Sequence, residues 1–165
     1  MRIDSHQHFW QYDPREYPWM TGALAALRRD HLPSDLEPLL EAAGVDGCVA
    51  VQARQTLAES RWLLNLTDHY PMIRGVVGWV DLRGKTVDRE LEELARHPRF
   101  VGVRHVAQDE PDDEFLTGEE FVRGVGRLKD FDLAYDILIY PRQLPAAIRL
   151  VERLPEQRFV LDHLG

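Results

Sequence analysis

Two histidines stand one residue apart near the start of the chain, in "RIDSHQHFW", and an aspartate lies two positions before the first of them. Side chains alternate across a β-strand with a period of two, so Asp4, His6 and His8 are predicted to face the same side. Two imidazoles aimed into one polar cavity form part of a transition-metal site, which needs further N, O or S ligands. Taken alone, the pair fits two partly exposed loop histidines equally well.

A third histidine, His163, ends the last apolar run in "FVLDHLG". Histidines at matching ends of two strands favour one ligand set, His6, His8 and His163, over a structural role for the last of them. Strand alternation predicts that Asp162 points away from His163. The histidines at positions 31, 69 and 97 are expected to be ordinary surface residues.

Strand-like apolar runs recur along the chain and must position these side chains. After an opening strand near residues 2–6 come "GCVAVQA" from Gly47, "IRGVVGWVDL" from Ile73, "RFVGVRHV" from Arg99, "LAYDILIY" from Leu133 and "RFVLDHL" from Arg158. Several runs are apolar on both faces, which is typical of parallel strands covered by helices.

Helical signals lie between the apolar runs. Thr56 with Glu59, and Thr117 with Glu120, have the spacing of a capping box, and Gly44 is placed as a helix C-cap. Alternating strands and helices leave a closed (β/α)8 barrel or an open doubly wound sheet.

The turn after the first strand favours the barrel. A dinucleotide-binding sheet places a glycine-rich turn there, whereas this chain has "HQHFWQYDP". A barrel needs eight strands and about 250 residues. Residues 1–165, with six expected strands, are therefore predicted to be the N-terminal portion of a single barrel domain.

Composition argues for small-molecule chemistry. The formal net charge is −8 and no run of Lys or Arg exceeds two residues, so nucleic acid and membrane surfaces are not expected partners. The single cysteine, Cys48, lies in an apolar run and is expected to be buried, in a reducing compartment. Without an apolar leader or membrane span, a cytoplasmic location is predicted.

Candidate substrate contacts come from the strands. Arg104 interrupts an apolar run, so its charge must be paired or must face a polar cavity. A salt bridge to Asp136 and a substrate contact are equally favoured. Gln52 and Arg54 share a face at the end of the second strand, with a loop pair of no function as the alternative.

Three other features lie beside the expected cavity. Tyr140 ends the fifth strand and could hydrogen-bond a substrate, although packing is the commoner use of such a tyrosine. Trp10 is expected to pack over the barrel rim rather than stack on substrate. The acidic run "DEPDDE", residues 109–114, is expected to be a solvated loop.

The stretches "RIDSHQHFW", "AVQARQ", "GVRHV", "YDILIYPRQLP" and "FVLDHLG" together resemble the amidohydrolase superfamily. The nearest resemblance is to its lactonases, which include L-fuconolactone hydrolase and, more distantly, 2-pyrone-4,6-dicarboxylate lactonase. The resemblance implies a (β/α)8 barrel of the metal-dependent hydrolase type. It also implies hydrolysis of a lactone ring by an activated water.

The resemblance also implies roles for individual residues. His6, His8 and His163 correspond to the histidines that line the family's catalytic centre, which in some relatives holds a divalent metal such as Zn²⁺ and in others works without one. The family takes an essential aspartate from its eighth strand, which has no counterpart in residues 1–165, so the chain is expected to be a fragment.

Two function classes follow. The first is a hydrolase of sugar lactones or related cyclic esters in carbohydrate metabolism. Its partner is a small-molecule substrate, and a homo-oligomer is compatible with this class. The second is a non-catalytic half-barrel that binds a partner or its missing half.

Overall fold

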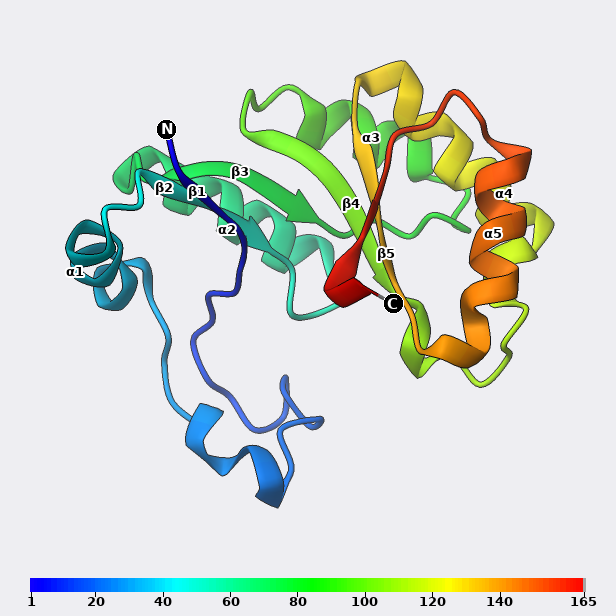
Figure 1. Ribbon diagram of the computed structural model, residues 1–165. Coiled ribbons are helices and arrows are strands. Elements are labelled where there is room, and N and C mark those ends of the chain that lie inside the picture. The colour runs from blue at the N-terminus through cyan, green and yellow to red at the C-terminus, as the bar shows by residue number, and fades with distance from the viewer. Residues whose placement is uncertain (165) are drawn as a thin grey trace.

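Six parallel strands form one curled sheet in the computed structural model, which describes residues 1–164 (Figure 1). The strands are β1 Ile3–Gln7, β2 Gly47–Val51, β3 Ile73–Gly78, β4 Phe100–Val106, β5 Ala134–Leu138 and β6 Phe159–Leu161. Their order in the sheet follows the sequence, and every neighbouring pair is parallel. The strands predicted from the apolar runs are all present.

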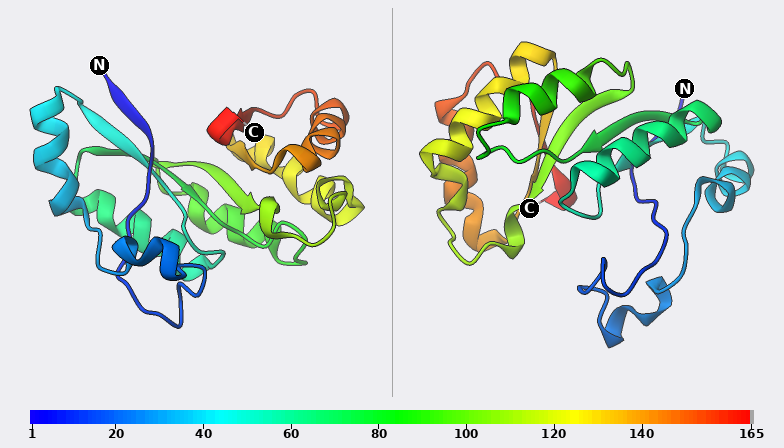
Figure 2. Two further views of the ribbon diagram at one scale, coloured as in Figure 1. Left: turned by 60° about the horizontal axis from the view of Figure 1, so that its bottom comes forward. Right: turned by 180° about the vertical axis from the view of Figure 1, so that it is seen from behind.

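Helices connect the strands and lie along one side of the curled sheet (Figure 2). They are α1 Pro33–Ala43, α2 Leu57–His69, α3 Val87–Ala95, α4 Glu119–Arg127 and α5 Leu144–Arg153. Strand side chains such as Val76, Val103 and Ile137 are buried against them, and Cys48 is buried in the same core, as predicted. This is part of a (β/α)8 barrel. None of the described helices is long and apolar enough to cross a membrane.

The helix ends follow the sequence signals only in part. At α2, the hydroxyl of Thr56 accepts the backbone N–H of Glu59 at 3.2 Å, and α1 ends at Gly44 in the left-handed conformation, with φ of 64°. The capping box predicted at Thr117 is wrong. A 3₁₀ turn, Phe115–Thr117, directs the Thr117 hydroxyl back to the carbonyl of Glu114, and α4 begins after Gly118.

A long excursion, residues 8–32, separates β1 from α1. It is closed by an antiparallel bridge in which Trp10 and His31 exchange backbone hydrogen bonds of 2.9 and 3.0 Å. Trp10, Tyr17 and Met20 form a small buried cluster inside it, and a 3₁₀ helix, Gly22–Leu27, follows. The expectation that His31 is an ordinary surface residue is wrong, because its ring packs against that of Trp10.

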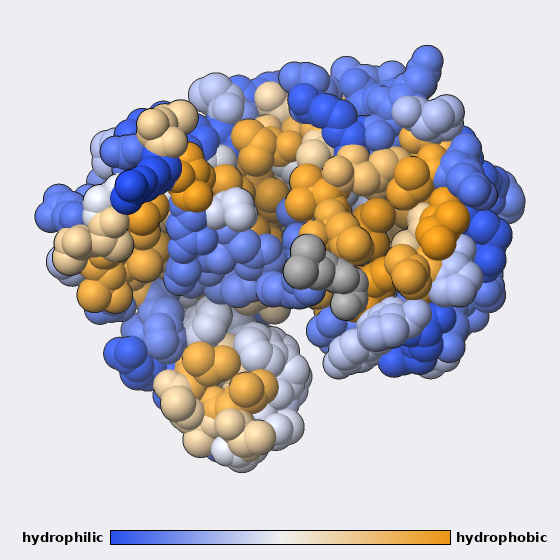
Figure 3. All heavy atoms as spheres, viewed as in Figure 1, coloured by the Kyte–Doolittle hydropathy of each residue, from blue (hydrophilic) through white to orange (hydrophobic). Residues whose placement is uncertain are grey.

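The inner, concave face of the curled sheet encloses a cavity. Side chains that include Ser5, Val49, Val77, Asp136 and Val160 line a cavity of about 820 Å³ on this face. Figure 3 shows apolar surface gathered near the middle of the molecule in the view of Figure 1. The sheet stays open between its outer strands, β1 and β6.

Candidate active site

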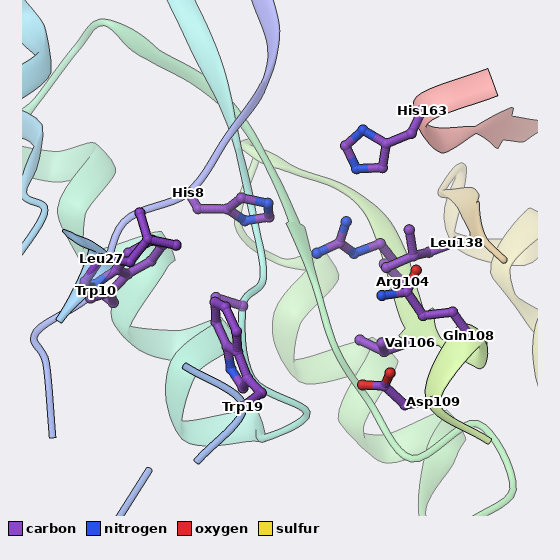
Figure 4. Close-up of a pocket in the computed structure, with 11 residues that line it drawn as sticks. His8, Trp10, Trp19, Leu27, Arg104, Val106, Gln108, Asp109, Leu138 and His163 are labelled. Atoms are coloured by element: carbon purple, nitrogen blue, oxygen red, sulfur yellow. Dashed lines mark hydrogen bonds between the residues drawn. The ribbon is translucent and has the colours of Figure 1, made fainter. Parts of the chain in front are cut away.

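The three predicted histidines converge at the carboxyl ends of the strands. His6 lies near the end of β1 and His8 just beyond it, and their Nε2 atoms are 3.1 Å apart. The ring of His163, which follows β6, has its centroid 4.8 Å from that of His6. Figure 4 shows His8 and His163 reaching toward the same space from opposite ends of the curled sheet.

The hydrogen bonds of His8 fix its protonation. Its Nδ1 lies 2.8 Å from the carbonyl oxygen of Val51, and because a carbonyl can only accept, Nδ1 carries the hydrogen. Nε2 is then left with a free lone pair directed toward His6. Burial, helped by the positive charge of Arg104, lowers the pKa of His8 to about 4. His8 is therefore a neutral imidazole at pH 7.

Asp162 belongs to this centre, contrary to the prediction from alternation. β6 ends at Leu161, and the following turn places His163 at a positive φ of 56°, so the period of two does not continue to residue 163. Asp162 is buried, with Oδ1 3.5 Å from His6 Nδ1 and Oδ2 2.9 Å from Arg104 Nη1. Burial acts to raise the pKa of Asp162, but the hydrogen bonds from His6 and Arg104 hold it below its ordinary value.

Arg104 connects the parts of the centre. From β4 its guanidinium donates to Asp162, to the backbone carbonyl of Gln52, and at 3.2 Å to Nε2 of His6. The predicted interior position is confirmed. The salt-bridge partner is Asp162 rather than Asp136. Asp136 lies opposite Arg104 in the register of β4 and β5, but the salt bridge is made with Asp162. The long arginine side chain reaches the strand ends, whereas the short carboxylate of Asp136 stays on the inner face.

Asp136 is a second buried carboxylate, and it lines the cavity on the inner face of the sheet. Burial is the main cause that raises its pKa to about 7, the charge of Asp162 adds to the shift, and Arg104 opposes it. Among the described residues, no cationic group lies within ion-pair distance of its carboxylate. Its predicted orientation toward the barrel interior is confirmed.

A cavity of about 360 Å³ opens beside the centre. His8, His163 and Arg104 form one part of its lining, as Figure 4 shows. Trp10, Trp19 and Leu27 of the excursion add an apolar wall. Val106 lines the cavity from the end of β4, and Gln108 and Asp109 line it from the loop that follows. The volume lies within the range of about 300–1,000 Å³ that is usual for small-molecule sites.

Three of the predicted substrate contacts do not reach this cavity. Gln52 is fully buried and lies behind Arg104, where its Nε2 donates to the Arg104 carbonyl at 3.3 Å. Arg54 forms an ion pair with Glu16 and lies over the ring of Tyr17. β2 ends at Val51, so alternation no longer determines where Gln52 and Arg54 point.

Tyr140 also lies outside the cavity lining. Its side chain is exposed and packs beside the guanidinium of Arg142. Trp10 packs at the rim as predicted, with its indole N–H donated to the carbonyls of Leu27 and Arg29. Sequence reasoning missed Trp19, Gln108 and Asp109 as lining residues, because loop positions carry no periodic signal.

The donor atoms suit a divalent cation. Ligand atoms of His6, Asp162 and His163 lie within 4.8 Å of one another, and the free Nε2 of His8 adjoins that of His6. Two imidazoles bound to one zinc at about 2.0–2.1 Å place their nitrogens a little over 3 Å apart. The separation of the two Nε2 atoms matches this requirement, and a cation bound there would replace the hydrogen bond that Arg104 now donates to Nε2 of His6.

A comparison with known families decides the classification. Residues 3–165 match the family model described as amidohydrolase. The chain belongs to this amidohydrolase family. The resemblance stated from the sequence motifs is therefore confirmed.

Curated relatives of this amidohydrolase chain are longer. It is 40% identical over 162 residues to a protein named L-fucono-1,5-lactonase from Burkholderia ambifaria, a match that covers 98% of the chain and 56% of the relative. The chain thus spans little more than half the length of the curated relatives it matches.

Solved structures agree with the fold. An amidohydrolase from Burkholderia multivorans, crystallised with bound zinc, superposes with a TM-score of 0.95 at 41% identity, covering 100% of this chain and 58% of that one. A probable 2-pyrone-4,6-dicarboxylic acid hydrolase from Acinetobacter baumannii gives a TM-score of 0.72 at 20% identity, covering 99% of this chain and 58% of that one. The second match supports the fold alone.

Proposed function

We propose that the full-length protein hydrolyses a sugar lactone or a related cyclic ester at the mouth of the barrel. The observation that carries the proposal is the convergence of His6, His8 and His163 with Arg104 beside a cavity of small-molecule size. Identity to a protein named L-fucono-1,5-lactonase supports the same reaction. This makes L-fuconolactone the first substrate to test and carbohydrate metabolism the expected context.

The described residues can perform part of this chemistry. Water must add to the ester carbonyl, the ring C–O bond must break, and the departing alkoxide must receive a proton. The guanidinium of Arg104 supplies a fixed positive charge that can stabilise negative charge on the carbonyl oxygen. Because the pKa of His8 is low, its Nε2 is suited to orient a water by accepting a hydrogen bond rather than to take up a proton.

We further propose that His6, His8 and His163, joined by Asp162, can hold a divalent cation, with Zn²⁺ the first to test. The donor set and the zinc named with the solved B. multivorans relative support this proposal. A bound cation of this kind lowers the pKa of water and polarises a carbonyl oxygen. Arg104 provides positive charge at the same place, so metal content and turnover should be measured separately.

The test uses the full-length protein with L-fuconolactone, and follows acid release by a pH indicator. Turnover is expected, and His163→Asn should lower kcat/KM by at least about 10²-fold. His69→Asn, at the exposed end of α2, is the matched control and should leave kcat/KM unchanged. If the full-length protein hydrolyses no lactone, the enzyme proposal is wrong and the non-catalytic half-barrel predicted as the alternative gains support.

Metal binding is tested by elemental analysis of the same preparations. The wild-type protein should hold close to one equivalent of zinc after dialysis, and His6→Ala should hold much less. Equal zinc in both proteins would contradict the proposed ligand set. Activity before and after chelation then shows whether the cation takes part in turnover.

A further inference from the structure

The loop that follows β4 is held rigidly at its backbone. The N–H of Val106 donates to the side chain of Gln55 at 2.8 Å, and the side chain of Gln143 donates to the carbonyl of Ala107 at 2.7 Å. Arg142 donates to the next carbonyl, that of Gln108, at 3.3 Å. Side chains from two separate segments of the chain thus fix Val106, the last residue of β4, and the first two residues of the loop, Ala107 and Gln108.

A buried histidine fixes the far end of the loop. His105 Nδ1 accepts the indole N–H of Trp79 at 3.4 Å, so Nε2 carries the hydrogen and donates to Glu110 at 2.7 Å. The ring of Phe115 stacks on the imidazole with a centroid distance of 4.8 Å. The turn Ala107–Asp109 is therefore anchored on both sides, although it lies in a loop.

Asp109 differs from the other acidic residues of its run. Glu110 bonds to His105, Asp113 pairs with Arg142, and Glu114 pairs with Arg149. Among the described residues, no hydrogen-bond donor or cation contacts the carboxylate of Asp109. The acidic run is largely exposed, as expected of a solvated loop, and several of its carboxylates form ion pairs while that of Asp109 has no partner among the described residues.

The side chains of Gln108 and Asp109 border the candidate active site. Both line the cavity that also contains His8, His163 and Arg104 (Figure 4). The side-chain amide of Gln108 is uncommitted in the described part of the chain, since only its backbone carbonyl accepts a bond. A carboxylate and an amide on an anchored turn are preorganised acceptors and donors for hydroxyl groups.

The apolar wall complements these polar groups. Trp10 is buried and held by its indole hydrogen bonds, whereas Trp19 is 41% exposed and lines the cavity from the same excursion. In Figure 4 the Trp19 ring stands on the other side of the cavity from Gln108 and Asp109. A sugar ring has apolar C–H groups and polar hydroxyls, so one wall of each kind suits it.

We propose that Asp109 and Gln108 select the substrate by binding hydroxyl groups of the lactone ring, while Trp19 packs against its C–H groups. The inference rests on the proposed lactonase function and deepens it, because it makes a polyhydroxylated ring the preferred substrate. A site built around hydroxyl groups discriminates strongly against analogues that lack them, since its polar groups are then left without partners.

The kinetic test compares two lactones in the full-length protein. Asp109→Asn should lower kcat/KM for L-fuconolactone by about 10- to 100-fold, the usual effect of losing a hydrogen bond to a charged group. The same variant should leave kcat/KM unchanged for δ-valerolactone, a lactone ring without hydroxyl groups. Asp112→Asn, in the same loop but outside the cavity lining, is the control and should change neither value.

A binding measurement separates this inference from the lactonase proposal. 1,5-Anhydro-L-fucitol keeps the ring hydroxyls but lacks the ester carbonyl, and its affinity can be measured by calorimetry without any turnover. Asp109→Asn should weaken its binding by about 10-fold or more. Unchanged binding and unchanged kinetics would overturn the role of Asp109 even if the lactonase proposal stands. Weakened binding without lactone turnover would support the hydroxyl site and contradict only the reaction.

The Trp19 wall has its own pair of variants. Trp19→Phe keeps an aromatic surface and should retain most of the affinity for 1,5-anhydro-L-fucitol. Trp19→Ala removes that surface and should lower the affinity several-fold, because the apolar contact between the indole and the C–H groups of the ring is lost. Equal affinities in Trp19→Ala and the wild type would remove Trp19 from the site.

Discussion

Arg104 joins residues that are far apart in the chain. Its guanidinium contacts His6 near the end of β1, the carbonyl of Gln52 after β2, and Asp162 after β6. A buried charge is costly unless its hydrogen-bonding groups find partners, and these partners lie where three strand ends meet. Arg104 therefore stabilises the fold and also holds the side chains of the candidate centre in place.

Removing the guanidinium should affect both properties. Arg104→Ala leaves the buried carboxylate of Asp162 without its cation, and we expect the free energy of unfolding to fall by about 3–5 kcal/mol. Arg127→Ala, at exposed ion pairs with Asp88 and Asp130, should change the free energy of unfolding much less, because exposed ion pairs contribute little to stability. Urea denaturation of the full-length protein measures both changes.

The same variant tests the catalytic role of Arg104. If it contacts substrate, folded Arg104→Ala should have a higher KM or a lower kcat for lactones than the wild type. An unchanged kcat/KM in a folded variant would limit Arg104 to a structural role.

Glu59 offers a pH-dependent prediction away from the centre. Its carboxylate is fully buried, and one oxygen accepts the N–H groups of Ala53 and Arg54 at 3.0 and 2.7 Å. Burial raises the pKa of Glu59 from 4.5 to about 7 despite these bonds. The folded state therefore binds the proton more tightly than the unfolded state.

The sign of the effect follows from this difference. Between pH 4.5 and about 7 the folded state carries more protons, so the contribution of Glu59 to stability falls as the pH rises through this window. Glu59→Gln keeps an oxygen to accept both N–H groups and removes the charge. We expect Glu59→Gln to gain stability relative to the wild type as the pH rises from 5 to 8, by an amount on the order of 3 kcal/mol. A pH-independent difference in unfolding free energy would contradict the raised pKa.

At the scale of elements, the strands were predictable because their apolar runs are unlike the polar segments around them. The convergence of His6 and His163 was predictable too, since parallel strands present their carboxyl ends at one edge of the sheet. The errors at Asp162 and Gln52 have one cause. Asp162 and Gln52 lie just beyond the ends of β6 and β2, where alternation no longer applies.

Loop residues of the site could not be found in this way. Trp19 and Asp109 lie in segments without a repeating pattern, and their positions depend on contacts with distant parts of the chain. The same holds for the cap of α4, where a 3₁₀ turn takes the hydroxyl of Thr117 that the sequence pattern assigned to the helix. Local spacing predicts elements, whereas tertiary contacts place the residues between them.

The close packing of α4 against the segment after β3 yields a prediction of its own. A methyl group on Gly124 would overlap the carbonyl group of Leu82, which is rigid backbone. Gly124→Ala should therefore lower the free energy of unfolding by about 1–3 kcal/mol, although alanine is the better helix former.

Gly126, in the same helix, is the matched control. A methyl group there would meet only the flexible end of the Leu154 side chain, at 3.2 Å. Gly126→Ala should therefore be neutral or stabilising by up to about 1 kcal/mol in thermal or urea denaturation. Similar losses in both variants would show that helix packing is not the cause.

At the scale of the whole molecule, the curled sheet has two outer strands and an uncovered inner face. β1 and β6 each present backbone groups along an edge. Val101 and Val160 on the inner face are 38% and 48% exposed, in a cavity lined largely by apolar side chains. Strand edges and contiguous apolar surface both promote association.

A polypeptide of residues 1–165 alone should therefore associate or aggregate, because contact between copies is the available way to cover these edges and this face. Light scattering coupled to size-exclusion chromatography would measure the mass across a range of concentrations, with the full-length protein as the control. Val160→Lys places a charge on the outer strand β6. This variant should reduce association of the 165-residue form, since charged edge residues oppose strand pairing. A 165-residue form that stays monomeric at high concentration and unfolds cooperatively would show that the curled sheet is stable without cover on its inner face.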